Sequence, residues 1–310
     1  TVTATYGQLT ATCTVSMDIA SAVKDYLAFE ALESGTFTLS IPSQVDSTLV
    51  TSVSYSTDNG STWTTIQNDN TAKTITTPTI AQGDKVLWKG EGIAYKKIYV
   101  NTPSKFTSTG RFNVSGNIMS LLYDDNFENQ TTLPSGDGYN FTSIFSNNTK
   151  LVSAENLTLP ATTMKTSCYG GMFSGCTSLT KVPTLTATTL ATGCYGSYNN
   201  QSLGMFENCT SLTTVPSNYL PATTLANNCY GSMFKGCTSL TTAPELPATT
   251  LAQLCYYQMF QGCTSLTTAP ELPATTLANN CYASMFKGCT GITSVPSNYL
   301  PATTLASGCY

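Results

Sequence analysis

The feature that most constrains this chain is a repeat in its second half. Cys229, Cys255 and Cys281 are each separated by 26 residues, and the run Cys-Thr-Ser-Leu-Thr-Thr-Ala-Pro-Glu-Leu-Pro-Ala-Thr-Thr-Leu-Ala begins at Cys237 and again at Cys263. A fixed period of this length is typical of stacked repeats, in which each unit buries its apolar side chains against its neighbours. We therefore expect equivalent side chains of successive units to lie directly above one another.

Residues 251–261 fit a short amphipathic helix. On a helical wheel of about 100° per residue, the nearly constant positions, among them Cys255, Met259 and Phe260, fall on one half-circle. The variable positions fall on the other half-circle, and they are Gln253, Leu254, Tyr257, Gln258 and Gln261. Glycine or asparagine precedes the second cysteine of each unit, and both accept the left-handed conformation at a helix C-terminus. We predict one short helix per unit, half buried and half exposed.

The other half of each unit predicts a strand. Cys263-Thr-Ser-Leu-Thr-Thr-Ala-Pro270 is rich in threonine, and Pro270 cannot donate a backbone hydrogen bond to a sheet. This composition favours a short parallel strand that the proline ends. One helix and one strand per unit define the predicted fold class, an α/β solenoid of the leucine-rich-repeat type, preceded by a small antiparallel β-sandwich.

The repeat pattern also resembles a known class. Cys-x-x-Leu-x-x-Ala-x-x-Leu-Pro-x-x-x-Leu, followed by Met-Phe-x-Gly-Cys, is similar to the BspA-like class of leucine-rich repeats, which is found in bacterial surface proteins and phage-associated proteins. The resemblance covers roughly residues 140–310 and is carried by several units. It implies an extracellular protein, on a bacterial cell surface or a virion surface. The unit here is somewhat longer than in that class, and a proline lies inside the expected strand.

The first half of the chain has a different residue pattern. Residues 1–17 alternate with period two around a Tyr-Gly turn, which predicts a hairpin and resembles the last two strands of a group-2 bacterial immunoglobulin-like domain. Residues 26–101 alternate strand and turn signals and predict the β-sandwich. Residues 105–143 are placed to cap the solenoid, which we assign to residues 144–310. We expect the chain to begin inside a larger protein and to stop halfway through a repeat, so that further repeats or a partner cover that end.

Charge and cysteine usage restrict the function classes. Residues 151–310 hold four of the thirteen basic and four of the seventeen acidic residues, so the repeats are neutral and lack the basic surface that nucleic acid needs. No apolar stretch reaches about 18 residues, so no membrane insertion is predicted. Eleven of the twelve cysteines occupy repeat positions, where we expect free, buried thiols, with disulfides between neighbouring units as the alternative. Zinc is not expected, since the chain has no histidine.

Two motifs in the first half admit a functional and a structural interpretation. Ser56-Thr-Asp-Asn-Gly-Ser-Thr-Trp63 matches the Asp-box of sialidases and related propellers, but the chain has one such box and a single arginine, Arg111. A hairpin turn with Trp63 packed beneath it is favoured. Asp124, Asp125, Glu128 and Asp137 could hold calcium, but their spacing matches no known loop, so a solvated acidic surface is favoured.

Three hypotheses for the function follow. The first is a non-catalytic binding or adhesion protein, with sandwich domains as a stalk and the repeats as the recognition surface for a host-surface glycan or protein. The second is a structural fibre or coat subunit that self-associates through the solenoid ends. The third and weakest is a glycan-active enzyme, because the chain lacks histidine, a glycine-rich phosphate loop and a carboxylate pair outside the cap. We expect no catalytic residue, no cofactor and no metal ligand.

The candidate binding residues lie on two surfaces. On the variable side of the units they are Leu254, Tyr257, Gln258 and Gln261, together with Tyr198, Asn199 and Asn200 of a seven-residue insertion at 198–204. On the strand side, Glu245 and Glu271 occupy equivalent positions beside rows of threonine, and this uniformity suits a repetitive ligand. Drift at weakly constrained exposed positions is the alternative explanation for the variable side.

Overall fold

The computed structural model describes residues 2–6, 9–13, 24–42, 52–67, 71–91, 103–134, 139–196 and 203–310. Its strands are β1 (Val2–Tyr6), β2 (Leu9–Cys13), β3 (Leu27–Ala31), β4 (Phe37–Ile41), β5 (Ser52–Ser56), β6 (Thr64–Gln67), β7 (Lys73–Thr76), β8 (Lys85–Glu91), β9 (Lys105–Ser108), β10 (Phe112–Asn117) and β11 (Leu151–Thr158). Its helices are the α-helix α1 (Ser120–Tyr123) and the 3-10 helix η1 (Asp124–Asn126).

The strands form three sheets. β1 and β2 pair as the antiparallel hairpin that the alternation in residues 1–17 predicts, with Val2 opposite Cys13. A six-stranded sheet has the order β11-β10-β3-β8-β5-β6, and a three-stranded sheet has the order β7-β4-β9. The six-stranded sheet is mixed, because β10 and β11 run parallel whereas β10 and β3 run antiparallel. The expected small antiparallel sandwich is therefore corrected to a mixed one that extends through β10 and β11.

A cluster of phenylalanine rings joins the two larger sheets. The ring of Phe29 in β3 lies with its centroid 5.3 Å from that of Phe37 in β4 and 4.8 Å from that of Phe106 in β9. Phe112 of β10 contacts both Phe29 and Phe37. All four side chains are at most 1% exposed, so they form the centre of the sandwich core. Phe106 and Phe112 lie in the segment 105–143, which thus supplies two strands to the same sandwich.

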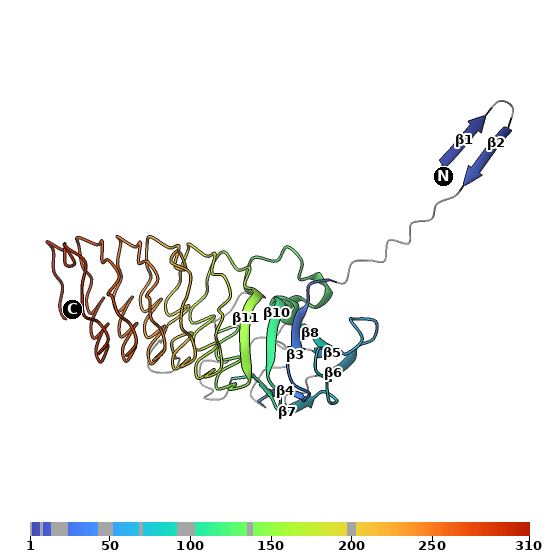
Figure 1. The fold of residues 1–310 in the computed structure, drawn as a ribbon, viewed down its shortest axis with the longest axis horizontal. Helices are drawn as coiled ribbons and strands as arrows, with labels where there is room; N and C mark the ends of the chain where they lie inside the picture. The colour runs from blue at the N-terminus through green and yellow to red at the C-terminus, as the bar shows by residue number, and fades with distance from the viewer. Residues whose placement is uncertain are drawn as a thin grey trace.

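The repeats continue the larger sheet at its β11 edge (Figure 1). Phe145 of the first coil stacks on Phe106 with 5.7 Å between ring centroids and 22° between ring planes. The backbone N–H of Phe106 donates to the carbonyl of Ile144 over 2.8 Å. The sandwich therefore covers the first coil of the stack, while the C-terminus lies at the opposite end (Figure 1).

The predicted helix in each repeat is wrong. In its place are rows of turns at residues 166–175, 227–236, 253–262 and 279–288, and no α-helix lies in the described part of residues 144–310. Every fourth residue of these rows has a positive φ, which is 58° at Leu254, 53° at Gln258 and 76° at Gly262. An α-helix needs a negative φ at every position. We call these four rows the turn ribbon.

Backbone N–H groups of the turn ribbon donate alternately to carbonyls of their own coil and to carbonyls of the following coil. The N–H of Met259 donates three residues back, to the carbonyl of Tyr256, over 3.1 Å. The next N–H, of Phe260, donates over 3.1 Å to the carbonyl of Met285 in the following coil. Every second N–H thus joins two coils, and the others close turns. An α-helix cannot supply such a cross-coil ladder, because its N–H groups bond within the helix.

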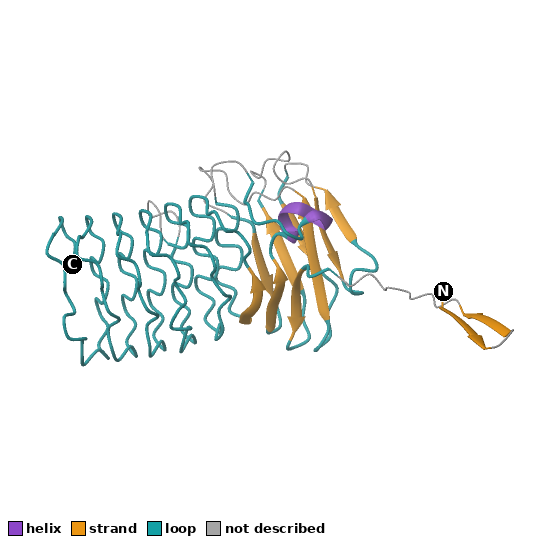
Figure 2. Ribbon diagram, turned by 90° about the horizontal axis from the view of Figure 1, so that it is seen from above, coloured by secondary structure: helices purple, strands orange, loops and turns teal. Residues whose placement is uncertain are grey.

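The predicted strand in each repeat is reduced to isolated contacts. Thr268 forms a single parallel bridge with Ser294, and the N–H of Thr267 donates to the carbonyl of Thr241 over 3.3 Å. Because the repeats lack both predicted elements wherever the structure describes them beyond β11, the α/β solenoid of leucine-rich-repeat type is wrong. The described residues of 159–196 and 203–310 form a stack of irregular coils, which Figure 2 draws as loops.

Equivalent side chains of successive coils do lie above one another, as the repeat predicts. Tyr230, Tyr256 and Tyr282 stack with ring centroids 5.8 and 5.7 Å apart and interplanar angles of 15° and 5°. Phe234 and Phe260 stack 5.8 Å apart at 3°. Two ladders of parallel rings therefore fix the register of the coils.

The cysteines of the repeats are free thiols, which confirms the prediction over its disulfide alternative. The Sγ of Cys237 donates to the carbonyl of Phe206 over 3.1 Å, and the Sγ of Cys263 donates to the carbonyl of Phe234 over 3.1 Å. Burial raises the pKa of Cys263 to about 12. These thiols therefore stay protonated and serve as small packing groups that also bond the preceding coil.

Candidate functional site

The two predicted glutamates lie on one outer edge of the coil stack, which we call the proline edge and define as residues 243–247, 270–273 and 296–301. The chain is extended here, and its side chains alternate in burial. Leu246 is 3% exposed and Leu272 is 4% exposed, whereas Glu245 and Glu271 face solvent. An extended chain points successive side chains to opposite sides, so the buried leucines force both carboxylates outward.

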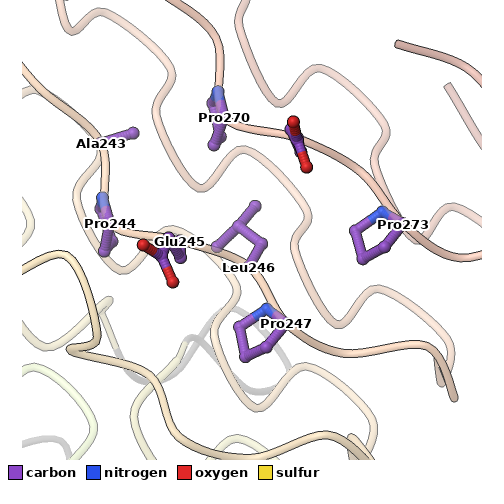
Figure 3. Close-up of a pocket in the computed structure, with 8 residues that line it drawn as sticks. Ala243, Pro244, Glu245, Leu246, Pro247, Pro270 and Pro273 are labelled. Atoms are coloured by element: carbon purple, nitrogen blue, oxygen red, sulfur yellow. The ribbon is translucent and has the colours of Figure 1, made fainter. Parts of the chain in front are cut away.

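Glu245 and Glu271 meet in one hollow of the proline edge. The hollow has a volume of about 540 Å³, and it is lined by Ala243, Pro244, Glu245, Leu246, Pro247, Pro270, Glu271 and Pro273. Figure 3 shows Pro244 and Pro247 on one coil and Pro270 and Pro273 on the next, with the carboxylate of Glu245 beside Pro244. The N–H of Glu245 donates to the carbonyl of Ser217 over 2.8 Å, which fixes the backbone that carries this carboxylate. The four prolines have fixed φ angles and add to this rigidity.

A second hollow continues the first along the stack. Its volume is about 330 Å³, and Glu271 and Pro273 line both hollows. The second hollow adds polar groups from the next coil, including Ser297, Asn298 and Tyr299. The two hollows therefore form one groove, the proline-edge groove, that crosses three successive coils. Sequence analysis finds the two glutamates but misses this groove, although the repeated Pro-Glu-Leu-Pro is a signal for it.

The groove carries negative charge without a local counter-ion. Its lining contains two carboxylates and no lysine or arginine. Within the described residues, neither Glu245 nor Glu271 forms an ion pair. Thr241, Thr242, Thr267 and Thr268 are exposed on the same two coils. The arrangement offers hydrogen-bond acceptors and hydroxyl groups that recur once per coil.

The other predicted surface belongs to the turn ribbon. Leu254, Tyr257, Gln258 and Gln261 are half-buried there and do not form the exposed half of a helix. The Nε2 of Gln258 donates to the hydroxyl of Tyr257 over 2.9 Å. The Oε1 of Gln261 is buried without a partner among the described residues. These side chains pack over the ribbon, and no hollow among those described unites them.

The remaining candidates, Tyr198, Asn199 and Asn200, lie outside the described residues. The structure therefore brings Glu245 and Glu271 together, places Leu254, Tyr257, Gln258 and Gln261 in one coil, and leaves the insertion residues untested.

The acidic residues after α1 are counter-ions of a buried lysine that sequence analysis misses. Lys89 of β8 is 8% exposed, and its Nζ lies 2.8 Å from both carboxylate oxygens of Asp125 and 3.2 Å from the Oδ1 of Asp124. The same Nζ lies 4.5 Å from the ring centroid of Trp63. Burial raises the pKa of Asp125, but hydrogen bonds from Lys89 and Tyr26 outweigh it, so the pKa is lowered.

This ion pairing corrects the interpretation of Asp124 and Asp125 as a merely solvated surface. Glu128 lies 3.3 Å from the Nζ of Lys24, and Asp137 lies outside the described residues. Across the described ranges, no group of three or more histidine, cysteine, aspartate or glutamate residues is placed to hold a metal ion. The same ranges contain no helix long and apolar enough to cross a membrane.

The single Asp-box forms the hairpin turn that the sequence predicts. Asp58 accepts hydrogen bonds from the N–H of Thr62 over 2.9 Å and from its hydroxyl over 2.6 Å, in the turn between β5 and β6. Hydrogen bonding to Thr62 lowers the pKa of Asp58 to about 2. Trp63 packs against Tyr26 with ring centroids 4.9 Å apart. The box therefore stabilises a turn.

No protein-family model, no curated protein and no solved structure matches this chain. The resemblance of the repeat pattern to bacterial and phage surface proteins thus stays untested, and the site must be interpreted from its own geometry.

Proposed function

We propose that this chain is a non-catalytic binding protein that recognises a glycan through the proline-edge groove. The observation that carries the proposal is that equivalent glutamates of successive coils, Glu245 and Glu271, line one hollow and that Glu271 also lines the next. A ligand in this groove meets similar groups at each coil. A polymer of repeating sugar units offers hydroxyl groups in that manner.

The chemistry of the lining favours hydroxyl-bearing ligands. A carboxylate has two oxygens and accepts hydrogen bonds from two neighbouring hydroxyls, and such charge-assisted bonds are stronger than neutral ones. The proline rings supply apolar faces between the carboxylates. Sites of this type combine an apolar wall with a few fixed polar groups. The lining offers no basic group to an anionic ligand, so neutral or amino sugars are the expected class.

The setting that we propose is an extracellular or virion surface, with the β-sandwich as a support and the coils as the recognition surface. The alternative function, a structural fibre whose subunits join end to end, is less well supported. The sandwich covers one end of the stack through Phe106, Phe145 and Ile144. An end-to-end filament needs two open ends.

A glycan-active enzyme would use the same two carboxylates, which line one hollow. Both carboxylates are exposed to solvent, and the hollow that they line is open to solvent. Acid–base catalysis relies on paired carboxyl groups whose environments push their pKa values apart, commonly with water excluded. The open groove therefore supports binding better than catalysis.

A glycan array tests the proposal with the chain of residues 1–310 and the double variant Glu245→Gln, Glu271→Gln. Glutamine keeps the size of each side chain and removes its charge. We expect binding of at least one glycan class and a loss of affinity of about tenfold per carboxylate, since a hydrogen bond to a charged group contributes about 1.5–3 kcal/mol. Glu155→Gln is the matched control, because Glu155 is exposed on β11 and lines a hollow with Thr184, which occupies the position equivalent to Glu245, so that this hollow holds a single carboxylate.

Three results would contradict the proposal. One is the absence of binding to any glycan, with capture of a protein instead. Another is equal affinity of the double variant and the control. The third is release of shortened sugars during incubation, which would indicate an enzyme.

A further inference from the structure

The side chains of the first hollow of the proline-edge groove accept hydrogen bonds but do not donate them. Its two polar side chains, Glu245 and Glu271, are carboxylates, which have no donor when they are ionised. Four of its eight lining residues are prolines, which have no backbone N–H group. The N–H of Glu245 already donates to the carbonyl of Ser217 over 2.8 Å. A ligand in this hollow must therefore bring most of the donors itself.

Positive and negative charges of the coil stack lie on different surfaces. Lys235 and Lys287 occupy equivalent positions of the turn ribbon, and the Nζ of Lys235 lies 3.4 Å from the Oε1 of Glu207. Glu245 and Glu271 instead line the groove, and within the described residues neither forms an ion pair. The linings of both hollows contain no lysine or arginine. The groove therefore favours a ligand that carries positive charge.

The two carboxylates recur at the spacing of the coils. Glu245 and Glu271 are equivalent residues of successive coils, and in the same two coils the rings of Phe234 and Phe260 stack 5.8 Å apart. This spacing is shorter than the screening length of about 8 Å at physiological salt, so two like charges at this spacing repel each other. A ligand with one cationic group per coil relieves the repulsion at both carboxylates. One sugar ring of a linear polymer is about as long as this spacing, so successive sugars can present one such group to each coil.

An exposed proline ring accompanies each carboxylate. Pro247 and Pro273 follow Glu245 and Glu271 by two residues, and an extended chain points residues two apart to the same side. Both prolines face solvent and line the hollow. Their rings supply a rigid apolar wall, against which the C–H face of a sugar ring can pack. A rigid wall favours a stiff ligand, because a flexible one loses more conformational freedom on binding.

We propose that the ligand of the proline-edge groove is a linear polymer of amino sugars whose amino groups are free and protonated. This inference rests on the proposed function and narrows its ligand class. Each ammonium group has three N–H donors and meets one carboxylate, so the ligand supplies both the donors and the positive charge that the groove lacks. The N-acetylated form of the same polymer is a poorer ligand. Its amide is neutral, and its carbonyl oxygen needs a donor that the side chains of the first hollow do not offer.

Isothermal titration calorimetry tests the inference with the chain of residues 1–310 and two oligomers of β-1,4-linked glucosamine of equal length, one with free amino groups and one N-acetylated. The buffer is mildly acidic, so that the amino groups are protonated. We expect the free amine to bind about tenfold more tightly, since two exposed ion pairs together account for about that factor. The preference should shrink as salt is raised and vanish in the double variant Glu245→Gln, Glu271→Gln. Glu155→Gln should retain it, because Glu155 lines a different hollow.

Failure of this inference is distinguishable from failure of the proposed function. Equal or tighter binding of the N-acetylated oligomer overturns the inference and leaves glycan recognition standing, and so does binding of neither oligomer when the array yields another glycan. Absence of binding to any glycan overturns both. An oligolysine of equal charge that binds as tightly as the free amine also overturns the inference, since charge alone would then account for recognition. A preference for the free amine that survives in the double variant overturns it as well, because the ligand would then bind away from Glu245 and Glu271.

Discussion

The sign of one glycine substitution tests the left-handed backbone of the turn ribbon at Gly262. Gly262 precedes the second cysteine of its coil and has a φ of 76°. A Cβ added there would meet nothing closer than the Cα of Gly236, at 3.8 Å. The substitution Gly262→Ala therefore introduces no clash, and its effect reports on backbone conformation alone.

The magnitude follows from two opposing terms. The left-handed conformation costs an alanine about 1–2 kcal/mol. The smaller conformational entropy of alanine in the unfolded chain offsets this by about 0.4–1 kcal/mol. We expect Gly262→Ala to lower the free energy of unfolding by about 1 kcal/mol. With a right-handed backbone at this position, the same change would instead raise the free energy of unfolding by roughly 0.5–1 kcal/mol.

Urea denaturation followed by tyrosine fluorescence measures this difference through the shift of the midpoint. Gly288→Ala repeats the test one coil later, because Gly288 has a φ of 78° and its added Cβ would lie 3.8 Å from the Cα of Gly262. Both variants should be destabilised. An increase in stability for either one would refute the left-handed turn at that position.

Three further predictions rest on packing and protonation. Phe234→Ala should cost about 3–5 kcal/mol in urea denaturation, and Phe286→Ala clearly less, because Phe234 is fully buried between two rings and Phe286 is half-buried; equal costs would contradict the ladder. Asp125 has a lowered pKa in the folded chain, so its ion pair with Lys89 should stabilise the fold above the ordinary pKa of 3.8 and lose this effect as pH falls through the lowered pKa. Acid denaturation of Lys89→Met should lack that component, and an unchanged profile would show that the pair contributes nothing. The carboxyl of Asp58 should titrate in an NMR experiment near pH 2, and a midpoint near 3.8 would contradict its hydrogen bonds to the turn.

The register of the stack could be predicted from the sequence, but the local conformation was predicted wrongly. Repetition of Cys255, Tyr256, Met259 and Phe260 at each coil is enough to place equivalent residues above one another. The helical wheel misleads because the buried pairs recur every four residues. Over the eight residues from Cys255 to Cys263, a helix rotates by only about 80° relative to a repeat of four residues. So short a segment cannot distinguish the four-residue period of the turns from the period of an α-helix.

A second signal in the sequence was available. Asn228, Ser232 and Gly236 occupy every fourth position of one coil, and asparagine and glycine are the residues that most readily adopt a positive φ. Leu254 and Gln258 hide this signal in the next coil, since neither residue favours the left-handed region. Their backbone follows the ladder to the neighbouring coils, which shows that tertiary hydrogen bonding overrides local preference there.

The candidate site was predictable only in part. The equivalence of Glu245 and Glu271 follows from the repeat, and their outward direction follows from the buried leucine after each. The groove depends on how proline segments of successive coils are spaced, which the sequence of one coil does not reveal. Lys89 could not be predicted as a buried charge, because its partners, Asp124 and Asp125, come from a distant segment that folds back onto β8.

Within each coil, the groups that hold the stack together differ from the glutamates that line the proline-edge groove, so binding can be tested separately from folding. Coils are held together by buried rings and by N–H groups of the turn ribbon, and neither involves the side chains of Glu245 or Glu271. In a stack of this kind, stability is close to a sum of nearest-neighbour interfaces. Substitutions at the two glutamates should therefore leave the interfaces intact, so a loss of ligand binding in those variants would report on recognition and not on unfolding. A variant of Phe234 would instead weaken a coil–coil interface. Any loss of ligand binding in that variant would follow from the altered fold and not from lost contacts to the ligand.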